Sequence, residues 1–156
     1  MKNVFFPDED ITANDLYFVC YMVERVARLL KQPNKYVVNT MGKREIEERL
    51  SLANVQHAEN PDAVANQWIV DYSLANGNVD VTDVDANLVT KIPTDLQMGK
   101  VYSRLIRSTL KDDENLADAV LRVYNDPLCE IIDNYNSSAY YEPSYYITRA
   151  YYQGGF

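Results

Sequence analysis

The side chains that could perform chemistry in this chain are few and far apart. His57 is the only histidine, and Cys20 and Cys129 are the only cysteines. A nucleophilic or metal site built on these residue types needs an imidazole or thiolate beside further ionisable partners. Each cysteine falls on an apolar helical pattern, where a thiol behaves as a small hydrophobic side chain. The sequence therefore favours a protein with no catalytic residue, no cofactor and no metal.

An acidic run in the middle of the chain looks at first like a cation site. Asp80, Asp83 and Asp85 are interleaved with valines, but the run lacks the glycine that makes the turn of a calcium loop and the glutamate that closes it. We therefore expect a solvated acidic loop. A glycine-rich phosphate loop is also missing, because the one Gly-Gly pair, Gly154 and Gly155, has no helix after it.

A basic stripe follows this acidic run. Lys100, Arg104, Arg107 and Lys111 recur at i, i+4, i+7 and i+11, so one face of a helix carries all four. In an acidic chain such a face could bind a phosphate or an acidic segment. The alternative is an ordinary solvated face, neutralised by the protein's own acids. Lys100, Arg104 and Arg107 are the candidate anion-binding residues.

Tyrosine is concentrated toward the end of the sequence, where eight of the thirteen tyrosines lie in the last 33 residues. A tyrosine combines an apolar ring with a hydroxyl at modest entropic cost, which suits a protein interface. The same rings can fill a helical core and satisfy their hydroxyls at its edge, so both interpretations stay open. The candidate partner-binding residues are Tyr135, Asn136, Tyr140, Tyr141 and Tyr145.

Apolar residues recur with helical spacing along most of the chain. Thr12 is a candidate N-cap for a first long helix, which ends before Pro33, and Thr94 has capping-box spacing at the start of a later one. Residues 36–38 fit either a helix or a strand. In the helix that follows them, Glu45 and Arg49 have the spacing of a stabilising ion pair.

About seven helices with short connections predict an all-α fold, a compact helical bundle. We expect one domain over residues 1–156, with an N-terminal lobe of residues 1–75 and a C-terminal lobe of residues 94–156. The acidic connector between them, residues 76–93, is expected to contain a short extended segment.

Composition narrows the class of protein. The chain has 156 residues and a formal net charge of −8, from 15 basic and 23 acidic side chains. This charge argues against a nucleic-acid partner. No apolar run is long enough to cross a membrane, and the start of the chain does not resemble a signal peptide. With two distant cysteines, a cytoplasmic location is expected.

Two groups of segments look familiar. The first is residues 18–24, 52–57 and 68–72, and the second is residues 99–106, 123–126 and 132–141. The first group resembles a family of short helical bacterial proteins of unknown function, often encoded beside predicted ADP-ribosyltransferase-like toxins. The second resembles a bacterial segment from the same gene neighbourhoods. Together they cover about half the chain and imply a toxin–antitoxin or mobile-element setting.

These observations favour a non-catalytic protein-binding module, an antitoxin or accessory partner that masks a basic protein such as a toxin encoded nearby. A homo-oligomer and a mimic of DNA also remain open. The alternative is a small-ligand protein or an enzyme with a pocket for a nucleotide or an anion. That pocket would be lined by Tyr135, Asn136, Tyr140 and Tyr141 and closed by Arg104 or Arg107.

Overall fold

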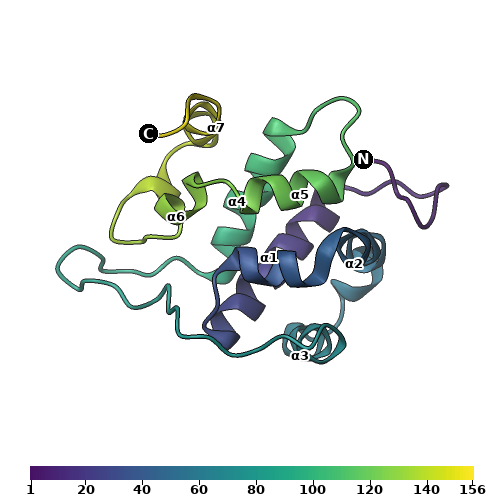
Figure 1. Ribbon diagram of the computed structural model, residues 1–156, viewed down its shortest axis with the longest axis horizontal. Coiled ribbons are helices and arrows are strands. Elements are labelled where there is room, and N and C mark those ends of the chain that lie inside the picture. Colours follow the sequence, from purple (N-terminus) through teal and green to yellow (C-terminus); the bar gives the residue numbers. More distant parts are fainter.

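The chain forms seven α-helices and one 3₁₀ helix, without a strand, in a computed structural model that describes all residues from Met1 to Phe156 (Figure 1). The predicted all-α class is therefore confirmed. No helix is long and apolar enough to span a bilayer. The elements are α1 (Ala13–Leu30), α2 (Asn34–Gln56), α3 (Pro61–Asp71), α4 (Asp95–Thr109), α5 (Leu116–Tyr124), α6 (Leu128–Ile132), η1 (Ala139–Tyr141) and α7 (Ser144–Gln153).

Local sequence signals set most helix starts. The Thr12 hydroxyl accepts the Asp15 N–H, and the Asp15 carboxylate accepts the Thr12 N–H, which makes a reciprocal capping box before α1. Thr94 and Gln97 form the same box before α4, as their spacing predicts. These bonds satisfy amides that the first turn of a helix leaves without partners.

The segment that fits either a helix or a strand, residues 36–38, is helical and belongs to α2. Gly42 interrupts this helix with φ 80° and ψ 171°, a conformation that residues with a Cβ atom rarely adopt. The helix axis therefore kinks at Gly42. The kink lets Val37 and Val38 before it and Ile46 after it all reach the core, where each is buried.

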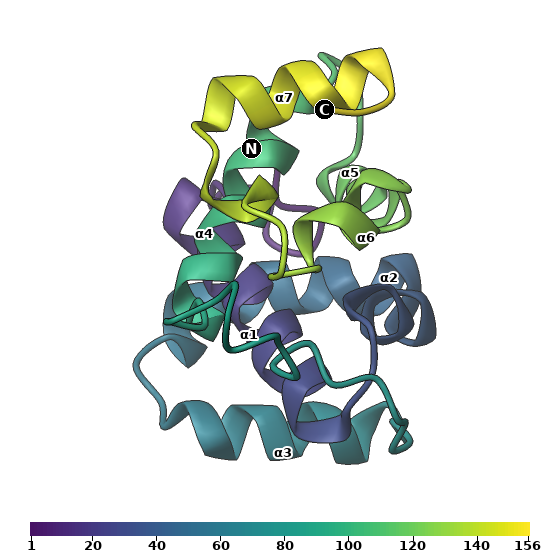
Figure 2. The same cartoon turned by 90° about the vertical axis from the view of Figure 1, so that its left-hand side faces the viewer.

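Helix α1 is central and packs against α2, α3 and α4. Figure 2 shows α3 at one end of the molecule and α7 at the other. One connected apolar core contains residues from both sequence halves, including Met22 and Trp68 from the first and Ile106 and Ile147 from the second. Helices α1 and α4 are in close contact at Gly99 of α4, which packs directly against the α1 backbone.

A buried guanidinium group joins α2 to the end of α3. Arg49 is only 5% exposed and does not pair with Glu45, contrary to the i, i+4 expectation. Its Nη2 donates to Asp71 at 2.8 Å and its Nε donates to the Tyr72 hydroxyl at 2.5 Å. The guanidinium also lies over the Trp68 ring. Burial explains the difference, because a buried charge needs several hydrogen-bond partners that one solvated neighbour cannot supply.

The connector has turns but no strand, and Figure 1 shows it as the long loop between α3 and α4. It is nevertheless fixed at several points. The N–H of Gly77 donates to the Leu30 carbonyl at 2.8 Å, and Lys31 pairs with Asp80 at 3.1 Å. Farther along, the Asp85 N–H donates to the Asn136 side chain at 2.7 Å. The connector is therefore held against the end of α1 and the segment before η1.

A substitution at Gly99 tests the contact between α1 and α4. A Cβ atom at this position would lie 2.7 Å from the Cα and N atoms of Tyr21. Alanine favours a helix over glycine by about 1 kcal/mol, but overpacking costs about 1–3 kcal/mol. We expect Gly99→Ala to lower the free energy of unfolding by about 1–2 kcal/mol in urea titrations. The exposed change Lys100→Ala is the control, and equal stability of both variants would contradict this contact.

Candidate functional site

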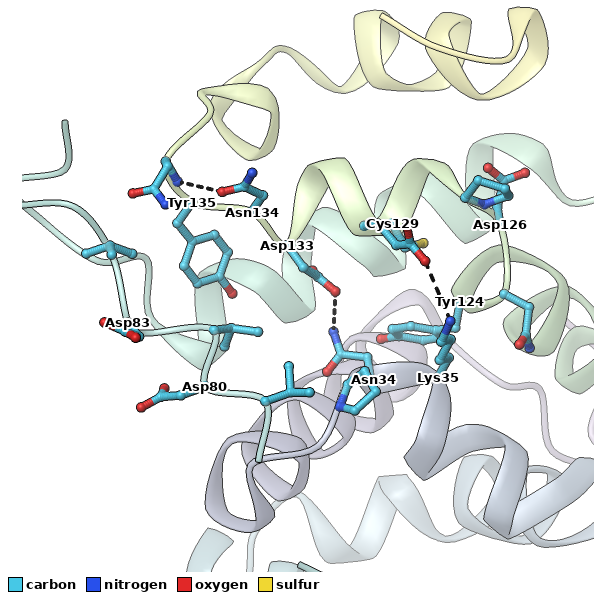
Figure 3. Close-up of a pocket in the computed structure, with 18 residues that line it drawn as sticks. Asn34, Lys35, Asp80, Asp83, Tyr124, Asp126, Cys129, Asp133, Asn134 and Tyr135 are labelled. Atoms are coloured by element: carbon cyan, nitrogen blue, oxygen red, sulfur yellow. Dashed lines mark hydrogen bonds and ion pairs between the residues drawn. The ribbon is translucent and has the colours of Figure 1, made fainter. Parts of the chain in front are cut away.

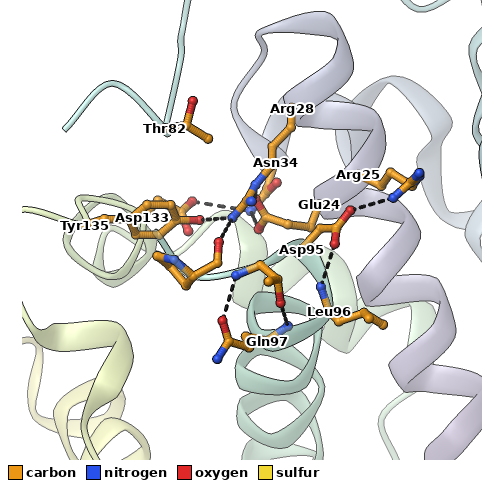
Figure 4. Close-up of polar contacts among 12 residues, drawn as sticks. Glu24, Arg25, Arg28, Asn34, Thr82, Asp95, Leu96, Gln97, Asp133 and Tyr135 are labelled. Carbon is orange, nitrogen blue, oxygen red and sulfur yellow. Dashed lines mark hydrogen bonds and ion pairs between the residues drawn. The ribbon is translucent and has the colours of Figure 1, made fainter. Parts of the chain in front are cut away.

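A buried polar cluster lies where α1, α4 and the C-terminal segment meet (Figure 4). At its centre are Glu24 and Arg28, one turn apart on α1, and Glu24 is only 1% exposed. Arg28 Nε donates to Glu24 Oε2 at 3.1 Å. Its Nη2 donates to the Pro93 carbonyl at 2.8 Å and to the Tyr135 hydroxyl at 2.9 Å. One guanidinium therefore links α1 to the end of the connector and to the chain after α6.

A second carboxyl group, that of Asp133, approaches the same cluster from the end of α6. The Asn34 amide bridges the two acids, because its Nδ2 donates to Glu24 Oε1 at 3.0 Å and to Asp133 Oδ2 at 3.4 Å. The Tyr102 hydroxyl donates to Asp133 Oδ1 at 2.5 Å. Asp133 thus has neutral donors only, whereas Glu24 has the ion pair with Arg28.

Burial shifts the protonation of both acids. Loss of water around Glu24 raises the pKa of its carboxyl group, although Arg28 and the Asn34 hydrogen bond oppose the shift. For Asp133, burial and the nearby negative charge of Glu24 raise the pKa well above its ordinary value, against the opposing effect of the Tyr102 hydrogen bond. Because Glu24 and Asp133 have only one guanidinium nearby, the pair favours a state in which one carboxyl group keeps its proton.

Asp133 lines a surface cavity of about 530 Å³ (Figure 3). Its walls come from the connector, the start of α2 and the chain around α6. Five acidic side chains and one lysine line it, so its negative charge is concentrated. They are Asp80, Asp83, Asp126, Glu130, Asp133 and Lys35.

The rim acids differ in how far other groups already engage them. The Asp80 carboxylate accepts from its neighbour Thr82 and from Lys31, which lowers its pKa to about 2. Glu130 is paired only loosely, with its Oε1 at 3.7 Å from the Lys35 Nζ, and Asp83 has no side-chain partner. Charge at the rim is thus only partly neutralised within the molecule.

A buried hydroxyl lines the same cavity without a hydrogen-bond partner. Tyr124 is 2% exposed, and its ring stacks on Tyr102 with 4.7 Å between ring centroids. Figure 3 shows the Tyr124 hydroxyl on the side of the ring that faces Asn34. It makes no hydrogen bond of normal geometry, and the buried Cys20 thiol is close enough to help raise its pKa. Such unpaired buried groups are rare and call for a physical reason.

The structure divides the predicted binding residues between two places. Tyr135 is buried and lies with Asn136 at the acidic cavity. Tyr140 and the 82% exposed Tyr141 line a separate groove of about 220 Å³ between α4 and the start of α7. Tyr145 is exposed on α7 and lines neither.

The predicted basic stripe is also divided. Lys100 and Arg104 line the second groove with Tyr140 and Tyr141, whereas Arg107 lines neither cavity. Neither Lys100 nor Arg104 forms an ion pair within the protein. An acid from outside the chain could therefore bind there without displacing an internal partner.

The remaining candidates for chemistry lie apart from one another. His57 is exposed, and its Nδ1 lies 2.9 Å from the Ala53 carbonyl of its own helix. Both thiols are buried, and burial raises the pKa of Cys20 to about 12. The acids of the connector do not converge with other ligating groups around a common point.

Glu24, Arg28, Asn34 and Asp133 are not among the site residues predicted from the sequence. A signal for Glu24 was present, since it lies four residues after Cys20 on the apolar face of the first long helix. An acid on a buried stripe must find a partner inside the protein. No comparable signal marks Asp133, which follows a five-residue helix.

Comparison of the chain with protein-family models, with curated proteins and with solved structures found no match. The resemblance to proteins encoded beside toxins therefore remains a prediction.

The raised pKa of Asp133 predicts how stability changes with pH. The folded protein holds this proton more tightly than the unfolded chain does, so the stabilisation is complete below the carboxyl pKa of the unfolded chain, about 4. It is lost as the pH rises through the folded-state pKa. We expect Asp133→Asn to match the original protein near pH 4 and to exceed its free energy of unfolding by about 1 kcal/mol at pH 8.

Urea titrations at both pH values would measure this difference. Asp83→Asn, which removes an exposed rim acid, is the matched control and should not change the pH dependence. An Asp133→Asn variant that is less stable than the original protein at pH 8 would show that the ionised carboxylate stabilises the fold.

Proposed function

We propose that this protein is a non-catalytic binding module, an antitoxin or accessory protein of a bacterial toxin–antitoxin or mobile-element system, which holds a basic segment of a partner protein. The supporting observation is the cavity beside the connector, where five acidic side chains face one lysine. Complementary charge guides a basic partner to such a surface and penalises an acidic one. The proposed location is the cytoplasm, where reducing conditions keep both cysteines free.

The acidic rim suits recognition of a protein. Asp83 and Glu130 come from the connector and from α6, so a bound segment would contact two parts of the chain at once. Exposed aromatic rings elsewhere, at Tyr141 and Tyr145, could add apolar contacts. The overall charge of −8 favours rapid association with a basic partner and makes the rate sensitive to salt.

Charge removal at the rim tests this proposal. The purified product of the neighbouring gene is titrated into the protein by isothermal calorimetry. We expect the double variant Asp83→Asn, Glu130→Gln to weaken the complex about tenfold, because two attractive charges are lost.

The control variant Asp112→Asn, Asp113→Asn removes the same charge from the α4–α5 loop, outside both cavities. It should retain full affinity. Equal losses in both variants, or no complex with the original protein, would contradict the proposal.

A second candidate function is binding of a small phosphate-bearing ligand, such as a nucleotide, in the groove between α4 and α7. It is favoured by two cations that form no ion pair within the protein, Lys100 and Arg104, beside the rings of Tyr140 and Tyr141. A ring can stack on a base while a guanidinium binds phosphate. The carboxylate of Glu142 in the same groove opposes anions, so this function ranks second.

Two arginines of one helix provide a matched test of this groove. We expect Arg104→Gln to weaken binding of a fluorescent nucleotide about tenfold, through loss of a charge-assisted hydrogen bond. Arg107→Gln removes the same charge outside the groove and should have little effect. Fluorescence anisotropy measures both affinities. Identical affinities for the two variants would count against a ligand in this groove.

A further inference from the structure

We infer that the acidic cavity beside the connector is a proton-coupled site for the guanidinium group of an arginine side chain, with Asp133 as its deepest acidic contact. This inference rests on the proposed function, since it names the group of the basic partner that enters the cavity. The cavity has unused hydrogen-bonding capacity, unbalanced negative charge and space for such a group.

The floor of the cavity has capacity for more hydrogen bonds than it makes. Asp133 Oδ2 accepts one long bond of 3.4 Å from Asn34, although a carboxylate oxygen can accept two good ones. The Tyr124 hydroxyl, fully buried in the same lining, has no partner. A guanidinium carries five N–H donors in a plane, so one group could serve several acceptors together.

Charge favours the same ligand. Asp133 is partly buried and has no ion pair, and the one guanidinium nearby, that of Arg28, is already bound by Glu24, Pro93 and Tyr135. A second cation would balance the second acid. The rim acids Asp80, Asp83, Asp126 and Glu130 would attract it to the entrance.

The volume is also suitable. About 530 Å³ is within the range of cavities that hold small ligands, and it accommodates an arginine side chain together with the backbone on either side. Valines of the connector, Val81 and Val84, contribute apolar wall against which the methylene groups of the side chain could pack.

Entry of this cation would release a proton. Loss of water around the partly buried Asp133 and the negative charge of Glu24 favour its protonated form, against the Tyr102 hydrogen bond and the charge of Arg28. A guanidinium beside it favours the ionised form instead. The ionisable groups around Asp133 are Glu24 and Arg28 from α1, Lys35 from α2, Tyr102 from α4, Tyr124 from α5, Cys129 from α6, Tyr135 after α6 and the rim acids.

The probe for the test is N-acetyl-arginine amide, whose guanidinium stays charged throughout the working pH range. The titration is followed by NMR through the side-chain NH₂ signals of Asn34. We expect affinity at pH 8 to exceed that at pH 6 about tenfold, in proportion to the ionised fraction of Asp133. N-acetyl-citrulline amide, which has the same shape without the charge, is the matched control and should not bind.

Two variants test the residues at the floor of the acidic cavity, Asp133 and Tyr124. Asp133→Asn should abolish the pH dependence and weaken binding at pH 8 about tenfold. Tyr124→Phe removes only the unpaired hydroxyl, so it should leave stability equal or higher and still weaken the probe several-fold. If Tyr124 had a purely structural role, its substitution would not weaken probe binding while leaving the free energy of unfolding unchanged.

The outcomes separate this inference from the proposed function. Binding that does not change with pH, equal binding of the citrulline control, or no effect of Asp133→Asn would overturn the inference. If the partner protein still binds in a manner that depends on Asp83 and Glu130, the proposed function survives that failure. If the arginine probe binds as expected but no partner complex forms, the site stands and the proposed function fails.

Discussion

The guanidinium of Arg28 holds together parts of the chain that no local signal would join. It bonds to Glu24 on its own helix, to the carbonyl of Pro93 at the end of the connector and to the hydroxyl of Tyr135 after α6. Only a group with several fixed donors can satisfy three acceptors from three directions. This one side chain therefore fixes the end of the connector at Pro93 and helps to place one wall of the acidic cavity.

The same guanidinium leaves the cluster short of positive charge. It neutralises Glu24 but cannot do the same for Asp133, which relies on Tyr102 and Asn34. Burial of an acid without a cation costs stability, so a fold selected for stability alone would gain by replacing it with a neutral group. A buried acid that opens onto a charged cavity has a physical reason to persist when a cation from outside completes the cluster.

Sequence reasoning reached the helices because their signals are local. Caps such as Thr12 and Thr94 lie within three residues of the groups that they bind, and apolar stripes repeat within a few turns. The cavity could not be reached in this way, because the Asn34–Asp133 contact spans 99 residues. Arg49 shows the same limit, since the nearby Glu45 looked like its partner and burial directed it to α3 instead.

The irregular connector also affects how rigid the acidic cavity is. A loop without helix or strand is usually mobile and would have to be ordered by a ligand at an entropic cost. Here backbone bonds from Gly77 and Val79 to the end of α1, with the Asn136 and Arg28 contacts farther along, fix the loop before any ligand arrives. Most of that ordering cost is therefore met during folding. A modest number of charge contacts can then yield useful affinity.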